Sequence, residues 1–200
     1  MRDLYAKHLK KDWLDNLEDR ATWKTESIPD AALWSVHNLR KQKMIDFARQ
    51  RMQRQYRRFG EGPLKLNKAA EYLDSNALII GFARRFATYK RAALLTRDEK
   101  RFEKLLNNSK YPVQIIWAGK PYPVDHPAIS EFNELVHIGR QHKNMAVMIG
   151  YELALSKRLK QAADCWLNNP RVPREASGTS GMTASMNGAV NLSTDDGWIP

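Results

Sequence analysis

The sequence has one cysteine and no long apolar stretch, and both scarcities exclude classes of protein. With Cys165 alone, the chain can form neither an internal disulfide nor a cysteine-cluster metal site, and we expect this residue in the core. No apolar run reaches the roughly 18 residues that a membrane-spanning helix needs, and the first residues carry no hydrophobic signal region. A soluble, cytoplasmic protein without a membrane partner is the resulting prediction.

Acidic residues are few relative to basic ones. The chain has 22 Asp and Glu against 33 Lys and Arg, which gives a formal net charge of +11. Such an excess suits nucleic acid or a small anionic substrate, but no RNA- or DNA-binding motif accompanies it, so we do not expect nucleic acid. The five histidines show no metal-ligand spacing, and no metal is expected. Six arginines fall on one predicted helix, where a solvated face or an interface explains them most simply: Arg40, Arg49, Arg51, Arg54, Arg57 and Arg58.

Residues 1–66 are predicted to form helices and to serve as a linker or appendage. Leu9, Trp13 and Leu17 recur at four-residue spacing, which predicts an amphipathic helix over residues 4–17. Asp30 is predicted to cap a second, long helix that ends near Gly60. The expected apolar face of that helix contains Leu33, Val36, Met44, Phe47 and Ala48.

Residues 67–200 show the pattern of an α/β domain. Short apolar runs at residues 77–82, 113–118, 145–149 and 164–167 are typical of strands covered on both faces. Helix-like segments at residues 92–106, 129–140 and 152–162 separate these runs, and residues 180–187 and 190–192 continue the series. The alternation predicts a parallel sheet with right-handed crossovers, whose ligands bind beyond the carboxyl ends of the strands. Trp117 and Trp166, at strand ends, are expected in the core.

The first group of candidate site residues follows the first predicted strand. Arg84, Arg85, Lys90 and Arg91 place four positive charges within eight residues, with Tyr89 among them. Arginine forks and a lysine charge suit phosphate, and the tyrosine offers a ring and a hydroxyl to a sugar. A charged helix start is the alternative, but cations at a helix N-terminus oppose the macrodipole. The pattern therefore favours an anion site.

A second candidate follows the fourth predicted strand. Residues 175–188 are Glu-Ala-Ser-Gly-Thr-Ser-Gly-Met-Thr-Ala-Ser-Met-Asn-Gly. The backbone amides and hydroxyls of such a small-residue turn suit an anion or a sugar, and the Glu175 carboxylate can accept from two sugar hydroxyls. Most turns of this composition are ordinary loops, so composition alone leaves that alternative open. The position after a strand favours a binding role.

Four motifs in this order resemble the glycogen and α-glucan phosphorylases, especially the shorter bacterial and archaeal branch. They are Ile-Gly-Phe-Ala-Arg-Arg-Phe-Ala-Thr-Tyr-Lys-Arg at residues 80–91, Ile-Trp-Ala-Gly-Lys at 116–120, Trp-Leu-Asn-Asn-Pro-Arg at 166–171, and residues 175–188. The resemblance covers most of residues 33–198 and implies the C-terminal, Rossmann-like domain of a GT-B type glycosyltransferase fold, residues 67–200, preceded by linker helices. It further implies that the N-terminal domain and the end of the C-terminal domain are missing, so we expect these 200 residues alone to be inactive.

The resemblance also implies an activity, a cofactor and roles for individual residues. The family reaction is the reversible transfer of glucose between an α-1,4-glucan end and phosphate, with pyridoxal phosphate acting as a proton donor through its own phosphate. The partners implied are therefore α-glucan and phosphate or a sugar phosphate. The resemblance places the substrate and cofactor phosphates at Arg85 and Lys90, with Arg84 beside them. It places the glucosyl unit at Tyr89, Glu175, Ser177 and Gly178. The phosphate end of the site, where the cofactor binds, is expected at Thr179 and Gly181. Lys120 and Tyr151 match family positions near the cofactor.

One position departs from the family pattern. The family has a lysine after the methionine of this loop, and that lysine forms a Schiff base with pyridoxal phosphate, whereas here Met182 is followed by Thr183. Threonine has no amine, so no imine can form at this position. Three interpretations follow: an inactive or regulatory glucan-binding homologue, a glucan synthase with a nucleotide-sugar donor, and a phosphorylase that binds pyridoxal phosphate without a covalent bond.

Overall fold

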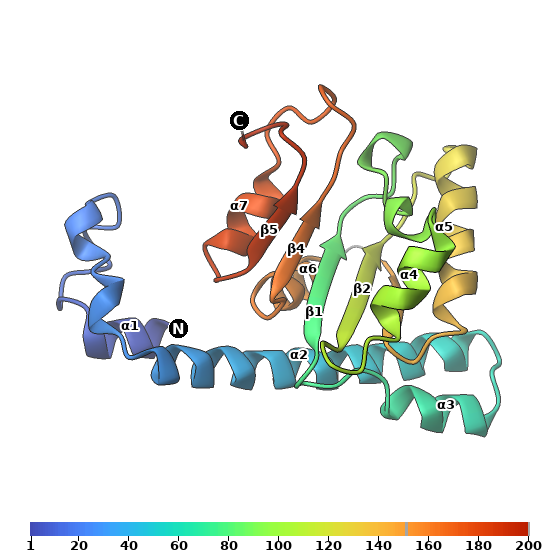
Figure 1. Ribbon diagram of the computed structural model, residues 1–200, viewed down its shortest axis with the longest axis horizontal. Coiled ribbons are helices and arrows are strands. Elements are labelled where there is room, and N and C mark those ends of the chain that lie inside the picture. Colours follow the sequence, from blue (N-terminus) through green and yellow to red (C-terminus); the bar gives the residue numbers. More distant parts are fainter. Residues whose placement is uncertain (151, 200) are drawn as a thin grey trace.

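The computed structural model describes residues 1–150 and 152–199 as an α/β fold around a five-stranded parallel sheet (Figure 1). The strands are β1 (Leu78–Ala83), β2 (Val113–Gly119), β3 (Met145–Ile149), β4 (Cys165–Asn168) and β5 (Val190–Ser193), each within one residue of its predicted bounds. Their order in the sheet is β3-β2-β1-β4-β5. The chain builds outward from β1 on one side and then crosses to the other, which puts a topological switch point between β1 and β4. The predicted parallel sheet is confirmed.

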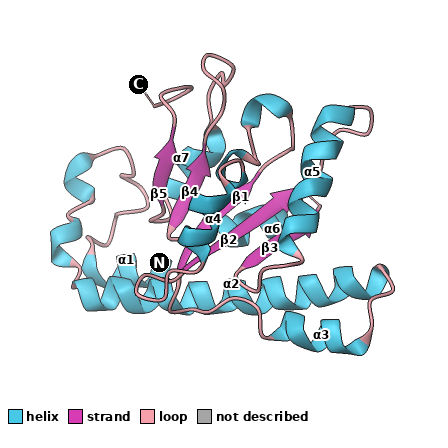
Figure 2. Ribbon diagram, turned by 45° about the vertical axis from the view of Figure 1, so that its right-hand side comes forward, coloured by secondary structure: helices cyan, strands magenta, loops and turns pink. Residues whose placement is uncertain are grey.

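Helices cover both faces of the sheet (Figure 2). Helices α4 (Glu99–Leu106) and α5 (His126–Gly139) pack on one face, and α2 (Asp30–Arg58), α6 (Leu153–Lys160) and α7 (Thr179–Ser185) on the other, with α3 (Pro63–Ala70) against α2. Side chains alternate between the faces along each strand. In β2, Ile116 and Ala118 belong to the core beside α2, whereas Ile115 and Trp117 belong to the core beside α4 and α5. Trp117 and Trp166 are fully buried, as predicted.

The long helix α2 is amphipathic over its second half. Its buried apolar positions recur every three to four residues: Met44, Ile45, Ala48, Met52 and Tyr56. The prediction that Leu33 belongs to this face is wrong, because the first turns of α2 extend beyond the sheet and leave Leu33 exposed (Figure 1). The prediction that Asp30 caps the helix is also wrong: Pro29 occupies the N-cap position, and Asp30 is the first helical residue.

The N-terminal helix is shorter than predicted. Helix α1 spans Arg2–His8 and is followed by the 3-10 turns η1 (Arg20–Thr22) and η2 (Thr25–Ser27). Trp13 packs edge-on against Tyr5 and Trp23, with ring centroids 5.5 Å and 5.9 Å apart. This aromatic cluster lies where the expected helix over residues 4–17 would have continued, so tertiary packing overrides the local spacing.

The division between residues 66 and 67 stays a prediction. Helix α3 runs across this position, and α2 contributes Met44 and Met52 to the same core as Ile116 of the sheet. The segment after β1 forms two 3-10 turns, η3 (Thr88–Lys90) and η4 (Leu94–Thr96), so the helix predicted from residue 92 begins only at Glu99. Cys165, predicted in the core, is half-buried at the start of β4.

Candidate functional site

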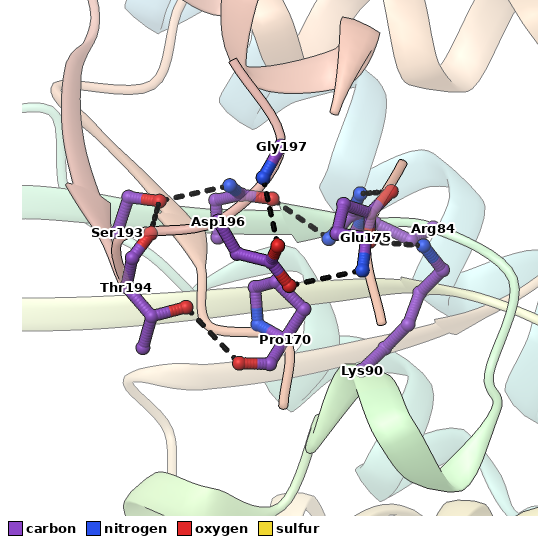
Figure 3. Close-up of polar contacts among 9 residues, drawn as sticks. Arg84, Lys90, Pro170, Glu175, Ser193, Thr194, Asp196 and Gly197 are labelled. Carbon is purple, nitrogen blue, oxygen red and sulfur yellow. Dashed lines mark hydrogen bonds and ion pairs between the residues drawn. The ribbon is translucent and has the colours of Figure 1, made fainter. Parts of the chain in front are cut away.

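The loops that follow β1 and β4 meet at the switch point of the sheet. Because the strands are parallel, their carboxyl ends lie at one edge, and β1 and β4 are neighbours there. The first loop contains residues 84–91, and the second contains residues 169–178. Figure 3 shows the side chains that come together from these loops and from the segment after β5.

A buried carboxylate between two cations is the centre of the candidate site. Glu175 Oε1 lies 3.0 Å from Arg84 Nη2, and Glu175 Oε2 lies 2.7 Å from Lys90 Nζ. The side chains of Arg84, Glu175 and Lys90 are 5%, 10% and 9% exposed. Ions this buried depend on their partners, because removing one leaves an uncompensated charge in the interior. With two cations and one carboxylate, the cluster carries a net positive charge.

Side chains at the ends of the neighbouring strands fix the guanidinium of Arg84. Its Nη1 donates to Asn168 Oδ1 at 2.7 Å, and Asn168 Nδ2 donates to Ser193 Oγ at 2.9 Å. Asn168, the last residue of β4, is fully buried. The positive charge of Arg84 also reaches Lys160: partial burial of the Lys160 ammonium is the larger cause of its lowered pKa, and the charge of Arg84 is the smaller one. Because the hydrogen bonds to Arg84 run through Asn168 and Ser193, β4 and β5 set its orientation together with its own loop.

Tyr89 and Lys90 lie in the single turn η3. Lys90 Nζ is 4.6 Å from the centroid of the Tyr89 ring, within range of a cation–π contact. A hollow of about 470 Å³ adjoins this turn and is lined by Thr88, Tyr89, Arg171 and Arg174. The backbone N–H of Arg171 donates to the Tyr89 carbonyl at 2.7 Å, which ties the two loops together. Within the described part of the chain neither Arg171 nor Arg174 forms an ion pair, so the hollow is positively charged.

The basic segment does not begin a long helix. After the turn η3, Arg91 has a φ of 50°, in the left-handed region, and its guanidinium donates to the carbonyls of Asn169 and Pro170 at 2.8 Å. The argument from the helix macrodipole therefore does not apply to these cations. Glu175 and backbone carbonyls balance the charges of Arg84, Lys90 and Arg91 instead.

The structure brings together four of the residues predicted for the site. Arg84, Tyr89, Lys90 and Glu175 form the cluster just described. Gly178 is buried in the loop and Gly181 in α7. The others are exposed, and among the described residues their side chains make no hydrogen bond to the cluster: Arg85, Ser177, Thr179 and Thr183. The roles assigned to all of these residues stay predictions.

Thr183 lies exposed on α7. Its Oγ1 donates to the carbonyl of Thr179 at 2.9 Å, a bond that a helical threonine commonly makes with the preceding turn. Position 183 thus presents a hydroxyl that is already engaged. Lys120, which follows β2, is exposed, and Tyr151 lies outside the described residues.

Sequence reasoning missed the residues that hold the cluster in place. Asn168 and Ser193 support Arg84, and Asp196 Oδ2 accepts from the backbone N–H of Glu175 at 2.9 Å (Figure 3). These residue types are common in loops, and their partners lie at least 21 residues away in the sequence. Spacing therefore offers no signal for Ser193 and Asp196, and although Asn168 falls within the motif at residues 166–171, that motif assigned it no role.

A second, partly buried carboxylate lies at the opposite, amino-terminal edge of the sheet. Asp164 Oδ1 is 2.7 Å from His37 Nε2, and Asp164 Oδ2 is 2.7 Å from both Lys41 Nζ and the backbone N of Ile79. Burial raises the pKa of Asp164, but the hydrogen bonds from His37, Lys41 and Ile79 outweigh burial and hold it below its ordinary value. A groove of about 810 Å³, with Trp34 in its wall, adjoins this cluster.

In residues 1–150 and 152–199, no helix has the length and apolar character needed to cross a membrane. The same residues contain no group of three or more His, Cys, Asp or Glu side chains that could hold a metal ion. The acids at the candidate site are otherwise engaged, Glu175 with cations and Asp196 with backbone N–H groups.

Known proteins similar to this chain include several phosphorylases. Maltodextrin phosphorylase of Thermococcus litoralis is 39% identical over 203 residues, which cover 99% of this chain and 24% of that protein. Glycogen phosphorylase of Aquifex aeolicus is 35% identical over 202 residues, 99% of this chain and 29% of that protein. Glycogen phosphorylase of Mycobacterium tuberculosis is 34% identical over 188 residues, 92% of this chain and 22% of that protein. No family model matches the chain.

The chain spans about a quarter of the length of these relatives. The similarity nevertheless extends over almost all of its own residues. The parallel sheet with its switch point is the Rossmann-like arrangement that the motifs led us to expect. Sequence similarity, fold and motifs therefore all support the glycogen and α-glucan phosphorylase family for this chain.

Proposed function

We propose that this chain supplies half of the glucosyl- and anion-binding site of an α-glucan phosphorylase-like glycosyltransferase. The observation that carries the proposal is the buried Glu175 carboxylate between Arg84 and Lys90 at the switch point of the sheet. A carboxylate accepts from sugar hydroxyls, and guanidinium and ammonium groups bind phosphate, so one cluster serves both ends of a glucosyl phosphate. The other half of the site, and with it turnover, belongs to the remaining part of a longer protein.

In the proposed site, sugar and phosphate binding are coupled through Glu175. While Glu175 holds Arg84 and Lys90, it opposes a second anion beside them. When the hydroxyls of a glucosyl unit donate to Glu175, the two cations become available to the phosphate. Ser177 and Gly178, next to Glu175 in the loop, add contacts to the sugar, while Thr179 and Gly181 lie toward the phosphate.

Three further arginines supply the charge that attracts the anion in this proposal. Arg85 is exposed beside Arg84, and Arg171 and Arg174 line the hollow next to Tyr89. Because Glu175 neutralises part of the buried cluster, these exposed cations provide the field that draws in phosphate or a sugar phosphate. The fork of a guanidinium matches two phosphate oxygens at once.

The described residues do not fit a covalently attached pyridoxal phosphate. At position 183 a hydroxyl donates to the carbonyl of Thr179, and Lys90, the lysine of the cluster, is paired with Glu175 at 2.7 Å. Neither offers a free amine at the place where the family pattern has its lysine. The central role in the proposed site therefore belongs to Arg84, Lys90 and Glu175, without a covalently bound cofactor.

The absence of an amine at Thr183 favours a second candidate function, glucan binding without phosphorolysis. A nucleotide-sugar-dependent synthase is a third, because a pyrophosphate would also suit the cations of the site. Turnover by a longer protein that contains this chain separates the three. Phosphate-dependent release of glucose 1-phosphate from α-glucan supports the proposal, release of a nucleoside diphosphate during glucan extension supports a synthase, and binding without either supports the second candidate.

The binding half of the proposal is testable on the 200-residue chain itself. Inorganic phosphate and α-D-glucose 1-phosphate are titrated against wild type, Arg85→Gln and Arg57→Gln by calorimetry. Both arginines are exposed, so neither change should disturb folding, and both remove one positive charge. We expect Arg85→Gln to weaken both ligands about tenfold, the loss of a charged hydrogen bond, and Arg57→Gln to leave them unchanged. Equal weakening in both variants would mean that only the overall charge matters and would contradict the proposed site.

A further inference from the structure

The segment after β5 holds the backbone of the Glu175 loop. Asp196 Oδ2 accepts from the N–H of Glu175 at 2.9 Å, and Asp196 Oδ1 accepts from the N–H of Gly197 at 2.9 Å. The N–H of Trp198 donates to the carbonyl of Ser177 at 2.9 Å. Among the described residues, the two hydrogen bonds made by the backbone of residues 175–177 both go to this segment. Figure 3 shows the Asp196 carboxylate between Glu175 and Gly197.

Close packing reinforces these hydrogen bonds. Gly197 has a φ of +69°, and a Cβ at this residue would lie 2.6 Å from the carbonyl oxygen of Ser177. The indole of Trp198 lies 3.2 Å from where a Cβ of Gly178 would stand. The segment and the loop therefore touch backbone to backbone, with no room for a side chain between them at Gly197.

Ser193 and Thr194, which lie just before this segment, support Arg84 and the start of the loop that leads to Glu175. Ser193 Oγ accepts from Asn168, whose Oδ1 accepts from Arg84. Thr194 Oγ1 donates to the carbonyl of Pro170 at 3.0 Å, at the start of the loop that leads to Glu175 (Figure 3). Residues 193–196 thus fix Arg84, the start of the loop at Pro170 and the loop backbone at Glu175.

We propose that Asp196 is a positioning residue that fixes the backbone of Glu175 so that its carboxylate bridges Arg84 and Lys90. A carboxylate suits this role because its two oxygens accept from two N–H groups at once and strengthen both bonds with charge. Without Asp196, the loop at residues 175–177 keeps the single bond to Trp198, and Glu175 can turn away from its cations. The consequence for ligand binding rests on the proposed function, whereas the geometric consequence does not.

The ammonium signal of Lys90 in a ¹⁵N NMR spectrum tests the geometric part. An ammonium held in a buried ion pair exchanges slowly and is visible, whereas a released one is not. The variants are Asp196→Ala, Asp196→Asn and the matched control Asp195→Asn, an exposed neighbour whose change removes the same charge as Asp196→Asn. Lys41, which is paired with Asp164 at 2.7 Å at the opposite edge, reports whether the protein is still folded.

We expect the Lys90 signal to disappear in Asp196→Ala while the Lys41 signal persists. Asp196→Asn should retain it in part, because the amide oxygen still accepts one hydrogen bond, and Asp195→Asn should retain it fully. If Asp196→Ala fails to fold, so that both lysine signals vanish, the Asp196→Asn spectrum decides. A Lys90 signal that is unchanged in the Asp196 variants, or equally reduced in Asp195→Asn, would overturn the proposal.

Ligand titration adds the functional consequence and separates this inference from the proposed function. In Asp196→Ala, the preference for α-D-glucose 1-phosphate over inorganic phosphate should fall about tenfold, because Glu175 no longer faces the sugar. A merely structural role for Asp196 would weaken both ligands alike. If the wild-type chain binds neither ligand, the proposed function fails, and the Lys90 signal still judges the role of Asp196.

Discussion

The two edges of the sheet hold similar constellations, a largely buried carboxylate between two nitrogen-bearing side chains, in different surroundings. At the amino-terminal edge, Asp164 pairs with His37 and Lys41, both from α2, at 2.7 Å. At the carboxyl-terminal edge, Glu175 pairs with Arg84 and Lys90, from the loop after β1, at 3.0 Å and 2.7 Å. Distances and burial alone do not tell the two clusters apart.

Their neighbours do tell them apart. Asp164 also accepts from the backbone N–H of Ile79, so three protein groups bond to its carboxylate, and two of them, His37 and Lys41, fasten α2 to the sheet. The hollow beside Tyr89, whose ring contacts Lys90, is lined by Arg171 and Arg174, whereas the groove beside Asp164 is lined by Asp30 as well as Arg40. The two clusters therefore differ in their surroundings. Asp164 joins α2 to the sheet beside a groove of mixed charge, whereas the Glu175 cluster lies next to a hollow that carries two further arginines.

The largest effect should come from removing the carboxylate of the Asp164 cluster. Asp164→Ala leaves Lys41, a 4% exposed side chain, without its partner, and breaking a buried ion pair costs about 3–5 kcal/mol. Urea unfolding of wild type and variant measures this loss. Asp164→Asn, which keeps an acceptor of the same shape, should lose less. A loss below about 1 kcal/mol for Asp164→Ala, typical of surface pairs, would remove the contrast with an exposed salt bridge.

A smaller effect, a gain and not a loss, is expected for phosphate affinity when the Glu175 carboxylate is replaced by a neutral amide. Glu175→Gln removes the anion that competes with phosphate, so inorganic phosphate should bind about tenfold more tightly, equivalent to about 1.4 kcal/mol. Asp164→Asn makes the same charge change at the other edge and should leave phosphate affinity unaltered. Calorimetric titration of both variants compares them directly. Similar gains in both would show that the two clusters differ less than their neighbours suggest.

A smaller effect is expected in the pH dependence of the unfolding free energy, to which Asp164 contributes. Its pKa is lowered in the folded protein from an ordinary value of 3.8, so its contribution to stability is complete above that value and is lost as pH falls through the folded pKa. The difference in unfolding free energy between wild type and Asp164→Asn should therefore be constant near neutral pH and shrink below about pH 4. Denaturant titrations at a series of pH values measure it. A difference that widens on acidification would reverse the assigned sign.

The smallest effect on stability is expected for exposed arginines, one at the hollow beside Tyr89 and one on α2. Arg171→Gln at the hollow and Arg57→Gln on α2 each remove an exposed cation and should change the unfolding free energy by less than about 0.5 kcal/mol. Only Arg171→Gln should weaken phosphate binding, because Arg171 lines the hollow and Arg57 does not. A loss of affinity in Arg57→Gln of equal size would assign the attraction to net charge alone.

Local patterns predicted elements whose burial is regular and failed where tertiary contacts decide. The runs that became β1 to β4 were placed within one residue, because strands covered on both faces are apolar throughout. The edge strand β5, whose residues are exposed or half-buried, was found as the continuation of the series. The helix expected over residues 4–17 failed because Trp13 packs on Tyr5 instead. At the site, the residues around Arg84 and Glu175 were found from their position after strands. Asp196 stands in no pattern, and the motif at residues 166–171 gave no sign that Asn168 holds Arg84.

By itself the sequence determined the parallel α/β class, the two strand-end loops that carry chemistry, and the missing amine at Thr183. These are properties of residue type and local order, which the chain carries whatever its folded form. The tertiary structure decided that Glu175 meets Arg84 and Lys90, that Asp196 holds the loop beneath it, and that Asp164 forms a matching cluster at the far edge. Glu175 and Lys90 are 85 residues apart in the chain, so only the strand order, with β4 beside β1, brings them within 2.7 Å.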